Sequence, residues 1–154
     1  MAIDARHERA LSVPVPLTHW SARYIGLPFV DLGRDVESTG VDCYGLLRAV
    51  LLHEAGVELS AHDELGPKDM MRAARALDTA ASEFPWKRVD EPKEFDAVLM
   101  RAAGGNRANT HCGVMADGGR VLHTTAATGS VLVPLTHLSI RSRIAGFYRH
   151  ADLQ

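Results

Sequence analysis

The segment at residues 40–47 reads Gly-Val-Asp-Cys-Tyr-Gly-Leu-Leu and leads from a loop into a helix. Asp42 stands where a helix N-cap belongs, and Gly56 stands where a left-handed C-cap belongs. The pattern between them predicts a helix from Cys43 to Ala55 with one apolar face. That face consists of Leu46, Leu47, Val50, Leu51 and Ala55.

Cys43 falls in the first turn of this predicted helix. The unpaired N–H groups of a first turn make a positive end, which lowers the pKa of a nearby thiol and favours the nucleophilic thiolate. The same N–H groups could stabilise an oxyanion, and Gly45 keeps the surface beside the sulfur small. We therefore expect Cys43 to be a partly accessible and reactive thiol. A small buried hydrophobic residue is the alternative, and position alone favours neither.

Two histidines provide partners for a cysteine nucleophile, since a nucleophile and its base need only be close in space. His111 and His123 are 12 residues apart and flank the turn Asp-Gly-Gly at residues 117–119, which predicts a β-hairpin. A tight turn brings both imidazoles to one face of the sheet. His111 would then act as the base for Cys43, and His123 would fix the tautomer of His111.

Cys112 follows His111 in the predicted strand, so its side chain points to the opposite face and we expect a core cysteine. Zinc is an alternative reading of His111, Cys112 and His123. Adjacent strand residues point apart, however, and no CxxC or HExxH spacing occurs, so we expect no metal site. With only two cysteines in the chain, we expect two free thiols rather than a disulfide.

The order of the other predicted elements indicates an α+β fold, because helices come first and strands follow. We expect an irregular lead-in over residues 1–16 and one domain over residues 17–154, with a long loop over residues 29–41. Thr18 would cap a short helix. The expected helices cover residues 19–25 and 68–82, and the expected strands cover residues 86–89, 96–101, 111–116, 120–124, 130–133 and 144–149.

Composition excludes several classes of protein. The 154 residues are 46% hydrophobic and 23% charged, which is typical of one globular domain that needs no disulfide to fold. A net charge of −2 does not show the excess of basic residues that is typical of nucleic-acid-binding domains. No apolar run of about 18 residues predicts a membrane span, and the N-terminus lacks a secretory pattern. We therefore expect synthesis in a cytoplasm without export by a signal peptide.

Several ordered motifs resemble the NlpC type of cell-wall cysteine peptidase over about residues 17–150. The Gly-Arg-Asp loop and the aromatic residue after the cysteine look like the branch carried by bacteriophage tails. The matching segments are Tyr24-Ile-Gly-Leu-Pro-Phe29, Gly33-Arg-Asp35, Asp42-Cys-Tyr-Gly-Leu46, Phe95-Asp-Ala-Val-Leu99, His111-Cys-Gly-Val-Met115 and Gly119-Arg-Val-Leu-His123.

This resemblance implies a papain-like α+β fold, with the nucleophile at the N-terminus of a helix packed on an antiparallel sheet that carries both histidines. It implies a catalytic triad of Cys43 as nucleophile, His111 as base and His123 as orienting residue, and no cofactor. The implied substrate is a peptidoglycan stem peptide, cleaved between D-glutamate and a diamino acid such as diaminopimelate.

Two positions near the implied substrate site depart from the family pattern. Many members have a tyrosine where Phe29 falls, and its hydroxyl contributes to the oxyanion hole. Many members also have serine where Tyr44 stands, next to Asp42, close to the N-terminal end of the substrate. Phe29, Asp42 and Tyr44 are thus the residues expected around the oxyanion and the substrate.

The resemblance also implies a place of action. A protein of a phage or prophage tail would be assembled in the host cytoplasm and delivered to the cell wall by the virion, with other tail proteins as partners. Two alternatives remain open from the residues. One is an amidase or acyltransferase that uses the same Cys-His pair, since acyl transfer shares the first half-reaction. The other is a catalytically weak structural protein of the tail tip.

Overall fold

The computed structural model describes residues 19–36, 39–59, 86–101 and 109–153. The predicted lead-in at residues 1–16 and the predicted helix at residues 68–82 lie outside the described residues. No helix in the described part of the chain is long and apolar enough to span a membrane.

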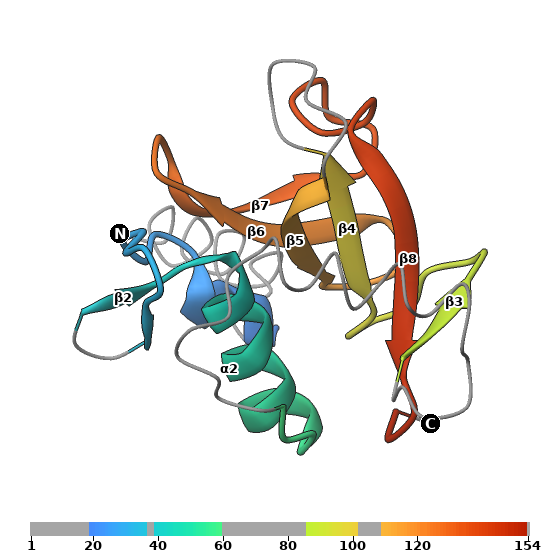
Figure 1. Ribbon diagram of the computed structural model, residues 1–154, viewed down its shortest axis with the longest axis horizontal. Helices are drawn as coiled ribbons and strands as arrows, with labels where there is room; N and C mark the ends of the chain where they lie inside the picture. Colours follow the sequence, from blue (N-terminus) through green and yellow to red (C-terminus); the bar gives the residue numbers. More distant parts are fainter. Residues whose placement is uncertain (1–18, 37–38, 60–85, 102–108, 154) are drawn as a thin grey trace, which may run out of the picture.

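A six-stranded antiparallel sheet and one long helix make up most of the described fold, so the α+β prediction is confirmed (Figure 1). The strand order in the sheet is β3-β8-β4-β5-β6-β7, and the helix α2 packs against β5 and β6. The elements are η1 (Trp20–Tyr24), β1 (Arg34–Asp35), β2 (Gly40–Val41), α2 (Cys43–Ala55), β3 (Trp86–Val89), β4 (Ala97–Arg101), β5 (Asn109–Met115), β6 (Arg120–Thr125), β7 (Gly129–Pro134) and β8 (Ile144–His150).

The helix α2 has the bounds that its caps predict. Asp42 has an extended backbone, and its side chain accepts a hydrogen bond from the N–H of Gly45. Gly56 adopts the left-handed conformation with φ of 69°, and its N–H donates to the carbonyl of Leu51. Burial of the apolar face against the sheet holds this short helix, because a helix of 13 residues is marginal without tertiary packing.

Two clusters of buried side chains occupy the two faces of the sheet. Alternate residues of β4 point to each cluster, which explains why its apolar run is continuous rather than alternating with polar residues. The first cluster lies between the sheet and α2 and includes Leu47, Leu99, Cys112, Val114 and Leu122. The second lies on the other face and includes Val98, Met100, Met115, Val121 and Ile140.

Most strands fall where the sequence predicts them, with shifts of one or two residues at their ends. The strand β5 begins at Asn109, two residues before the predicted start, because Asn109 pairs with Arg101 across an irregularity in the register. The loop over residues 29–41 also contains the two-residue ladder of β1 and β2. These differences do not change the predicted order of strands along the chain.

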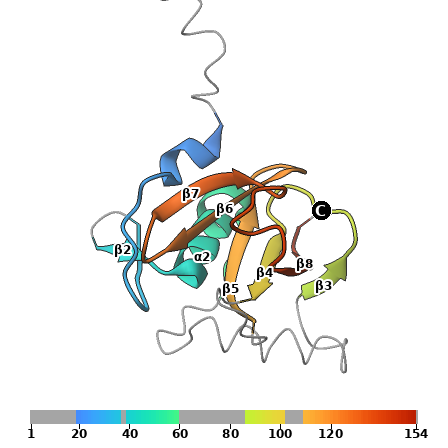
Figure 2. The same ribbon diagram turned by 90° about the horizontal axis from the view of Figure 1, so that it is seen from above.

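The first helical segment differs in type from the prediction. It is a five-residue 3₁₀ helix. Its N-cap is His19 and not Thr18 as predicted, because the side chain of His19 accepts from the N–H of Ser21. Its backbone continues in extended conformation at Ile25, so the segment has room for little more than one turn. Figure 2 shows this segment next to β7, where the N–H of Leu27 donates to the Ser130 hydroxyl over 2.7 Å.

The hairpin of β5 and β6 brings the two histidines to the same region of the sheet. Its turn is stabilised by the carboxylate of Asp117, which accepts from the N–H groups of Gly119 and Arg120. On β5, Gly113 leaves space for the neighbouring strand β6. A Cβ on Gly113 would lie 2.7 Å from Cγ2 of Val121 and 3.2 Å from Cβ of His123. Only a residue without a side chain fits there.

The packing at Gly113 leads to a stability prediction. Gly113→Ala should lower the free energy of unfolding by about 1–3 kcal/mol, the usual cost of overpacking a close contact. Gly118→Ala in the same hairpin is the matched control, because its Cβ would meet nothing closer than 3.8 Å. Urea unfolding of both variants measures the difference. Equal stability of the two variants would contradict the assigned role of Gly113.

Candidate active site

The N-terminal end of α2 holds Cys43 as the first residue of the helix. The carboxylate of Asp42 accepts from the N–H of Gly45 over 2.7 Å, and the Asp42 carbonyl accepts from the N–H of Leu46 over 2.9 Å. These bonds fix the backbone on both sides of the cysteine. Cys43 is only 2% exposed, so the expectation of a partly accessible thiol is wrong, because the helix end packs directly against the sheet.

A loop residue, Arg34, anchors the start of this helix. Its guanidinium donates to Asp42 Oδ1 over 2.6 Å and to the carbonyl of Gly33 over 3.0 Å. It also lies over the ring of Tyr44, with Cζ 5.0 Å from the ring centroid. The side chain of Asp42 is 1% exposed, so this ion pair is largely screened from water and restrains the loop strongly.

Gly45 has a different role from the one expected from the sequence. A Cβ at this position would lie 2.1 Å from the carbonyl oxygen of Gly33. Gly45 therefore allows the loop of Gly33 and Arg34 to approach the helix, where the Gly33 carbonyl also accepts from the N–H of Asp42. The sequence showed the Gly-Arg-Asp loop but gave no partner for Arg34, since the pairing of Arg34 with Asp42 depends on this tertiary contact.

The two histidines are in direct contact. Nε2 of His111 lies 3.0 Å from Nδ1 of His123, and the two rings meet edge to face with centroids 5.2 Å apart. Because Nε2 of His111 is engaged in this bond, Nδ1 is the nitrogen that remains for Cys43. His111 lies close enough to Cys43 for its hydrogen bonding and its charge to lower the pKa of the Cys43 thiol. The structure thus joins Cys43, His111 and His123 in one chain of contacts.

His123 lies deeper in the protein than His111. It is 4% exposed, and burial lowers its pKa to about 4, with further lowering from the charges of His111, Arg143 and His137. A neutral imidazole accepts at one nitrogen and donates at the other. His123 uses Nδ1 in its bond with His111, and its Nε2 has no hydrogen-bond partner among the described residues.

The thiol of Cys43 has an acidic environment. Its pKa is lowered to about 5, first by a hydrogen bond from Cys112 and then by the hydrogen bond and charge of His111, which together outweigh burial. The same contact with Cys43, together with burial, raises the pKa of Cys112. A thiol with this pKa is a thiolate at neutral pH, whereas the pKa of Cys112 moves in the opposite direction.

Cys112 combines an expected and an unexpected feature. It packs in the cluster beneath α2 with Val114 and Leu122, which confirms the prediction of a core cysteine, and both cysteines are free thiols. The effect of Cys112 on the pKa of Cys43 was not predicted. Strand alternation indicates the face to which Cys112 points, but it does not indicate that the end of α2 will rest on that position.

The residues expected around the substrate lie near the start of α2. Phe29 is half-buried, and its backbone bridges to Val41, two residues before Cys43. Asp42 is the helix cap, and Tyr44 is 7% exposed beneath Arg34. All three side chains therefore come from the helix start or from the segment that runs beside it.

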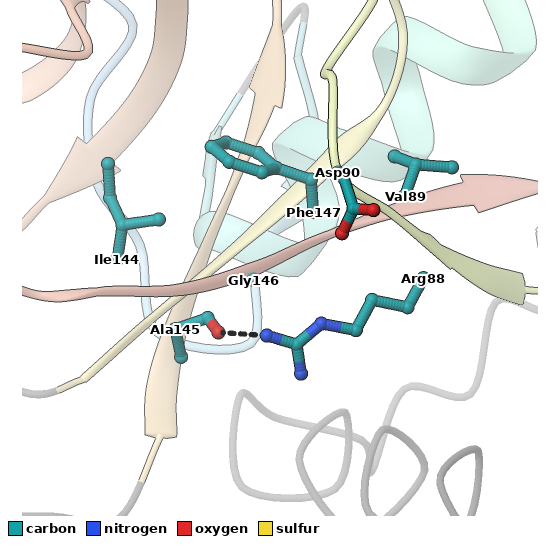
Figure 3. A pocket seen from close by; sticks show the side chains of 7 residues that line it. All are labelled: Arg88, Val89, Asp90, Ile144, Ala145, Gly146 and Phe147. Atoms are coloured by element: carbon teal, nitrogen blue, oxygen red, sulfur yellow. Dashed lines mark hydrogen bonds between the residues drawn. The ribbon is translucent and has the colours of Figure 1, made fainter.

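No group of three histidine, cysteine or acidic side chains is placed to hold a metal ion within the part of the chain that the structure describes. A shallow pocket of about 250 Å³ lies between β3 and β8, where Arg88 donates to the carbonyl of Ala145 over 3.2 Å (Figure 3). The strands β8 and β4 separate this pocket from β5. The pocket is therefore remote from the cysteine and the two histidines.

The fold resembles solved structures of the NlpC/P60 family. An NLP/P60 family protein similar to a lipoprotein, from Staphylococcus aureus, superposes with a TM-score of 0.59 at 20% identity, over 84% of this chain and 38% of that one. An NlpC/P60 family protein from Bacillus cereus gives 0.60 at 18% identity, over 83% and 37%. The NlpC/p60 domain of the peptidoglycan hydrolase SagA gives 0.52 at 21% identity, over 83% and 90%.

These likenesses show that the chain has an NlpC/P60-like fold. It spans less than two fifths of the length of the Staphylococcus and Bacillus proteins and nearly the whole SagA domain. No protein-family profile matches the sequence. No curated protein matches it either. The fold is thus recognised through its three-dimensional arrangement and not through overall sequence identity.

The environment of His123 leads to a prediction about pH. A group whose pKa falls from 6.5 to about 4 on folding contributes stability that is present above pH 6.5 and is lost as pH falls towards 4. As the pH is lowered from 6.5 to 4, the free energy of unfolding should therefore decrease less in His123→Gln than in the unsubstituted protein. Urea unfolding at several pH values measures both slopes. Other titrating groups contribute to both proteins, so identical slopes would contradict a neutral His123.

Proposed function

We propose that this protein is a cysteine peptidase that hydrolyses peptidoglycan stem peptides, with Cys43 as nucleophile, His111 as base and His123 as orienting residue. One observation carries the proposal. The thiol at the start of α2 contacts His111, whose other nitrogen is 3.0 Å from His123. This arrangement has the geometry of a nucleophile, a base and a third group that orients the base. The peptidoglycan hydrolase SagA has a domain of the same fold.

The chemistry follows from the protonation states. In this mechanism Nδ1 of His111 holds the proton that the Cys43 thiol has given up, and the Cys43 thiolate attacks the carbonyl carbon of the peptide bond. The carbon–nitrogen bond then breaks, and His111 returns the proton to the leaving amine, which leaves an acyl group on the sulfur. Water, deprotonated by His111, hydrolyses this thioester. His123 accepts from the Nε2–H of His111 throughout and keeps the ring in one orientation.

The oxyanion of this reaction needs hydrogen-bond donors. The backbone N–H of Cys43 is one candidate, because it belongs to the first turn of α2, where N–H groups have no partner within the helix. Phe29 runs beside this turn but has no hydroxyl to contribute. Backbone donors at the helix start therefore provide the main stabilisation in this proposal.

The proposed bond is the one between D-glutamate and a diamino acid such as diaminopimelate, in keeping with the ordered motifs around Cys43, His111 and His123. The proposed place of action is the cell wall, reached as part of a phage or prophage tail after synthesis in the bacterial cytoplasm. The Gly33-Arg34-Asp35 loop supports this place of action, because it resembles the branch of the family that bacteriophage tails carry. In this proposal Arg34 fixes the substrate side of the helix start by pairing with Asp42.

The proposal predicts the behaviour of three variants. Cys43→Ala and His111→Ala should each abolish release of peptide fragments from purified peptidoglycan, and the double variant should be no worse, since these groups act as a unit. His53→Ala is a matched control, because His53 is exposed on α2. Mass spectrometry of the fragments identifies the cleaved bond.

The products also distinguish the alternatives. Fragments that end in D-glutamate support the proposed bond, whereas cleavage between sugar and peptide indicates an amidase. An acyl-enzyme that is released only by an added amine or alcohol indicates an acyltransferase. Unchanged peptidoglycan with the folded, reduced protein would contradict the proposed peptidase and favour a structural role.

Phe29→Tyr tests the oxyanion hole. A well-placed donor lowers the barrier by about 3 kcal/mol, so a tyrosine hydroxyl should accelerate hydrolysis if the existing donors are incomplete. We expect an increase in kcat of about tenfold, which corresponds to about 1.4 kcal/mol. Steady-state rates on a stem-peptide fragment measure the change. Unchanged activity would show that backbone donors suffice, and lost activity in a folded variant would show that the hydroxyl clashes.

A further inference from the structure

The guanidinium of Arg34 contacts both chain neighbours of Cys43. It donates a hydrogen bond to Asp42 Oδ1 over 2.6 Å, and its Cζ lies 5.0 Å from the ring centroid of Tyr44. A further hydrogen bond, 3.0 Å long, goes to the carbonyl of Gly33. These contacts hold a side chain that is 11% exposed. The structure thus fixes a positive charge beside the residues that precede and follow the proposed nucleophile.

Asp42 is a buried carboxylate that needs a positive partner. Its side chain is 1% exposed. Its Oδ1 accepts from Arg34 and from the N–H of Gly45, whereas its Oδ2 has no hydrogen-bond partner among the described residues. A buried carboxylate is costly unless a cation pairs with it. Within the part of the chain that the structure describes, Arg34 is the cation that forms an ion pair with Asp42.

The charge of Asp42 acts against the ionisation of Cys43. The two residues are consecutive, so their Cα atoms are about 3.8 Å apart, and both are almost completely buried. Water therefore screens their charges weakly, and a like charge nearby disfavours the ionised form of a group. A serine or an asparagine would cap the helix without this charge. An aspartate directly before a thiolate nucleophile therefore calls for a compensating cation.

Tyr44 is affected by the two charges in opposite directions. Burial is the main cause of its raised pKa. Among the charged groups around its ring, Arg34 lowers this pKa more than Asp42 raises it. Both charges therefore act across the first turn of α2, and the positive charge outweighs the negative one at Tyr44.

We propose that Arg34 is a positioning residue that acts through Asp42: it cancels the negative charge of this carboxylate and thereby allows Cys43 to react as a thiolate. The proposal rests on the proposed function, in which Cys43 is the nucleophile. This role differs from the mechanical restraint of the loop, because it depends on the charges of the pair and not on its hydrogen bonds. Removing both charges should therefore harm the thiolate less than removing only the positive one.

The pH midpoint of alkylation at Cys43 tests this role. Rates with iodoacetamide are measured for Arg34→Gln, Asp42→Asn and the double variant across the pH range in which carboxylates and thiols titrate. Arg34→Gln should raise the midpoint by about one pH unit or more, because the charge of Asp42 is then uncompensated. Asp42→Asn should lower the midpoint, since the charge of Arg34 is then unopposed and the amide oxygen still accepts from Gly45. The double variant should have a midpoint close to that of the unsubstituted protein.

Arg23→Gln is the matched control, because it removes the same charge at the surface. Arg23 forms an ion pair with Glu54 of α2, and its side chain is 68% exposed, so water screens its charge. This variant should leave the midpoint unchanged. The other titratable groups beside the nucleophile are His111, Cys112 and Tyr44, which are the same in all variants.

A purely structural role of Arg34 predicts another order of midpoints. Loss of the ion pair would then disturb the site in every variant, and the double variant would be no better than Arg34→Gln. That order would overturn the proposal, as would an unchanged midpoint in a folded Arg34→Gln or a midpoint that Asp42→Asn does not lower. If Arg34→Gln does not fold, the double variant decides. It should fold with the midpoint of the unsubstituted protein, and a raised midpoint or a lost fold would overturn the proposal.

The unsubstituted protein separates a failure of this role from a failure of the proposed function. A midpoint in the ordinary thiol range, about pH 8.5, would contradict the proposed function. A low midpoint that does not respond to the charges of Arg34 and Asp42 would contradict the role of Arg34 alone.

Discussion

A buried negative charge at Cys43 is the constraint on which the rest of the site depends. A thiolate that is 2% exposed loses most of its hydration, and an unpaired buried charge would unfold the site or take up a proton. Three features compensate for this loss: the first turn of α2, the hydrogen bond from Cys112 and the contact with His111. Each requires the end of α2 to stay against β5.

The loop before α2 supplies that restraint. Arg34 binds Asp42, Asp42 caps the helix through Gly45, and the absence of a side chain on Gly45 lets the carbonyl of Gly33 approach. The sheet supplies the matching restraint on the histidines. Gly113 allows β6 to approach β5, and burial keeps His123 neutral beside His111. Backbone packing thus determines the protonation states of the reacting groups.

Local signals in the sequence predicted the elements, whereas contacts between distant segments could not be predicted from them. The bounds of α2 follow from Asp42 and Gly56 because helix caps are chosen by neighbouring residues. The proximity of His111 and His123 follows from a short turn. The ion pair of Arg34 and the effect of Cys112 on the pKa of Cys43 depend on how α2 rests on the sheet, which no local pattern specifies. Burial of Cys43 was missed for the same reason.

The pH dependence of alkylation at Cys43 tests most directly whether this cysteine is an activated thiolate. The folded protein is treated with iodoacetamide from pH 4 to 9, and the rate at Cys43 is followed by mass spectrometry, with denatured protein as the reference. The account predicts a midpoint at about pH 5 and a constant rate from about pH 6 upwards. A rate that keeps rising through the ordinary thiol range, about pH 8.5, would show that Cys43 is an unactivated thiol and would contradict the account.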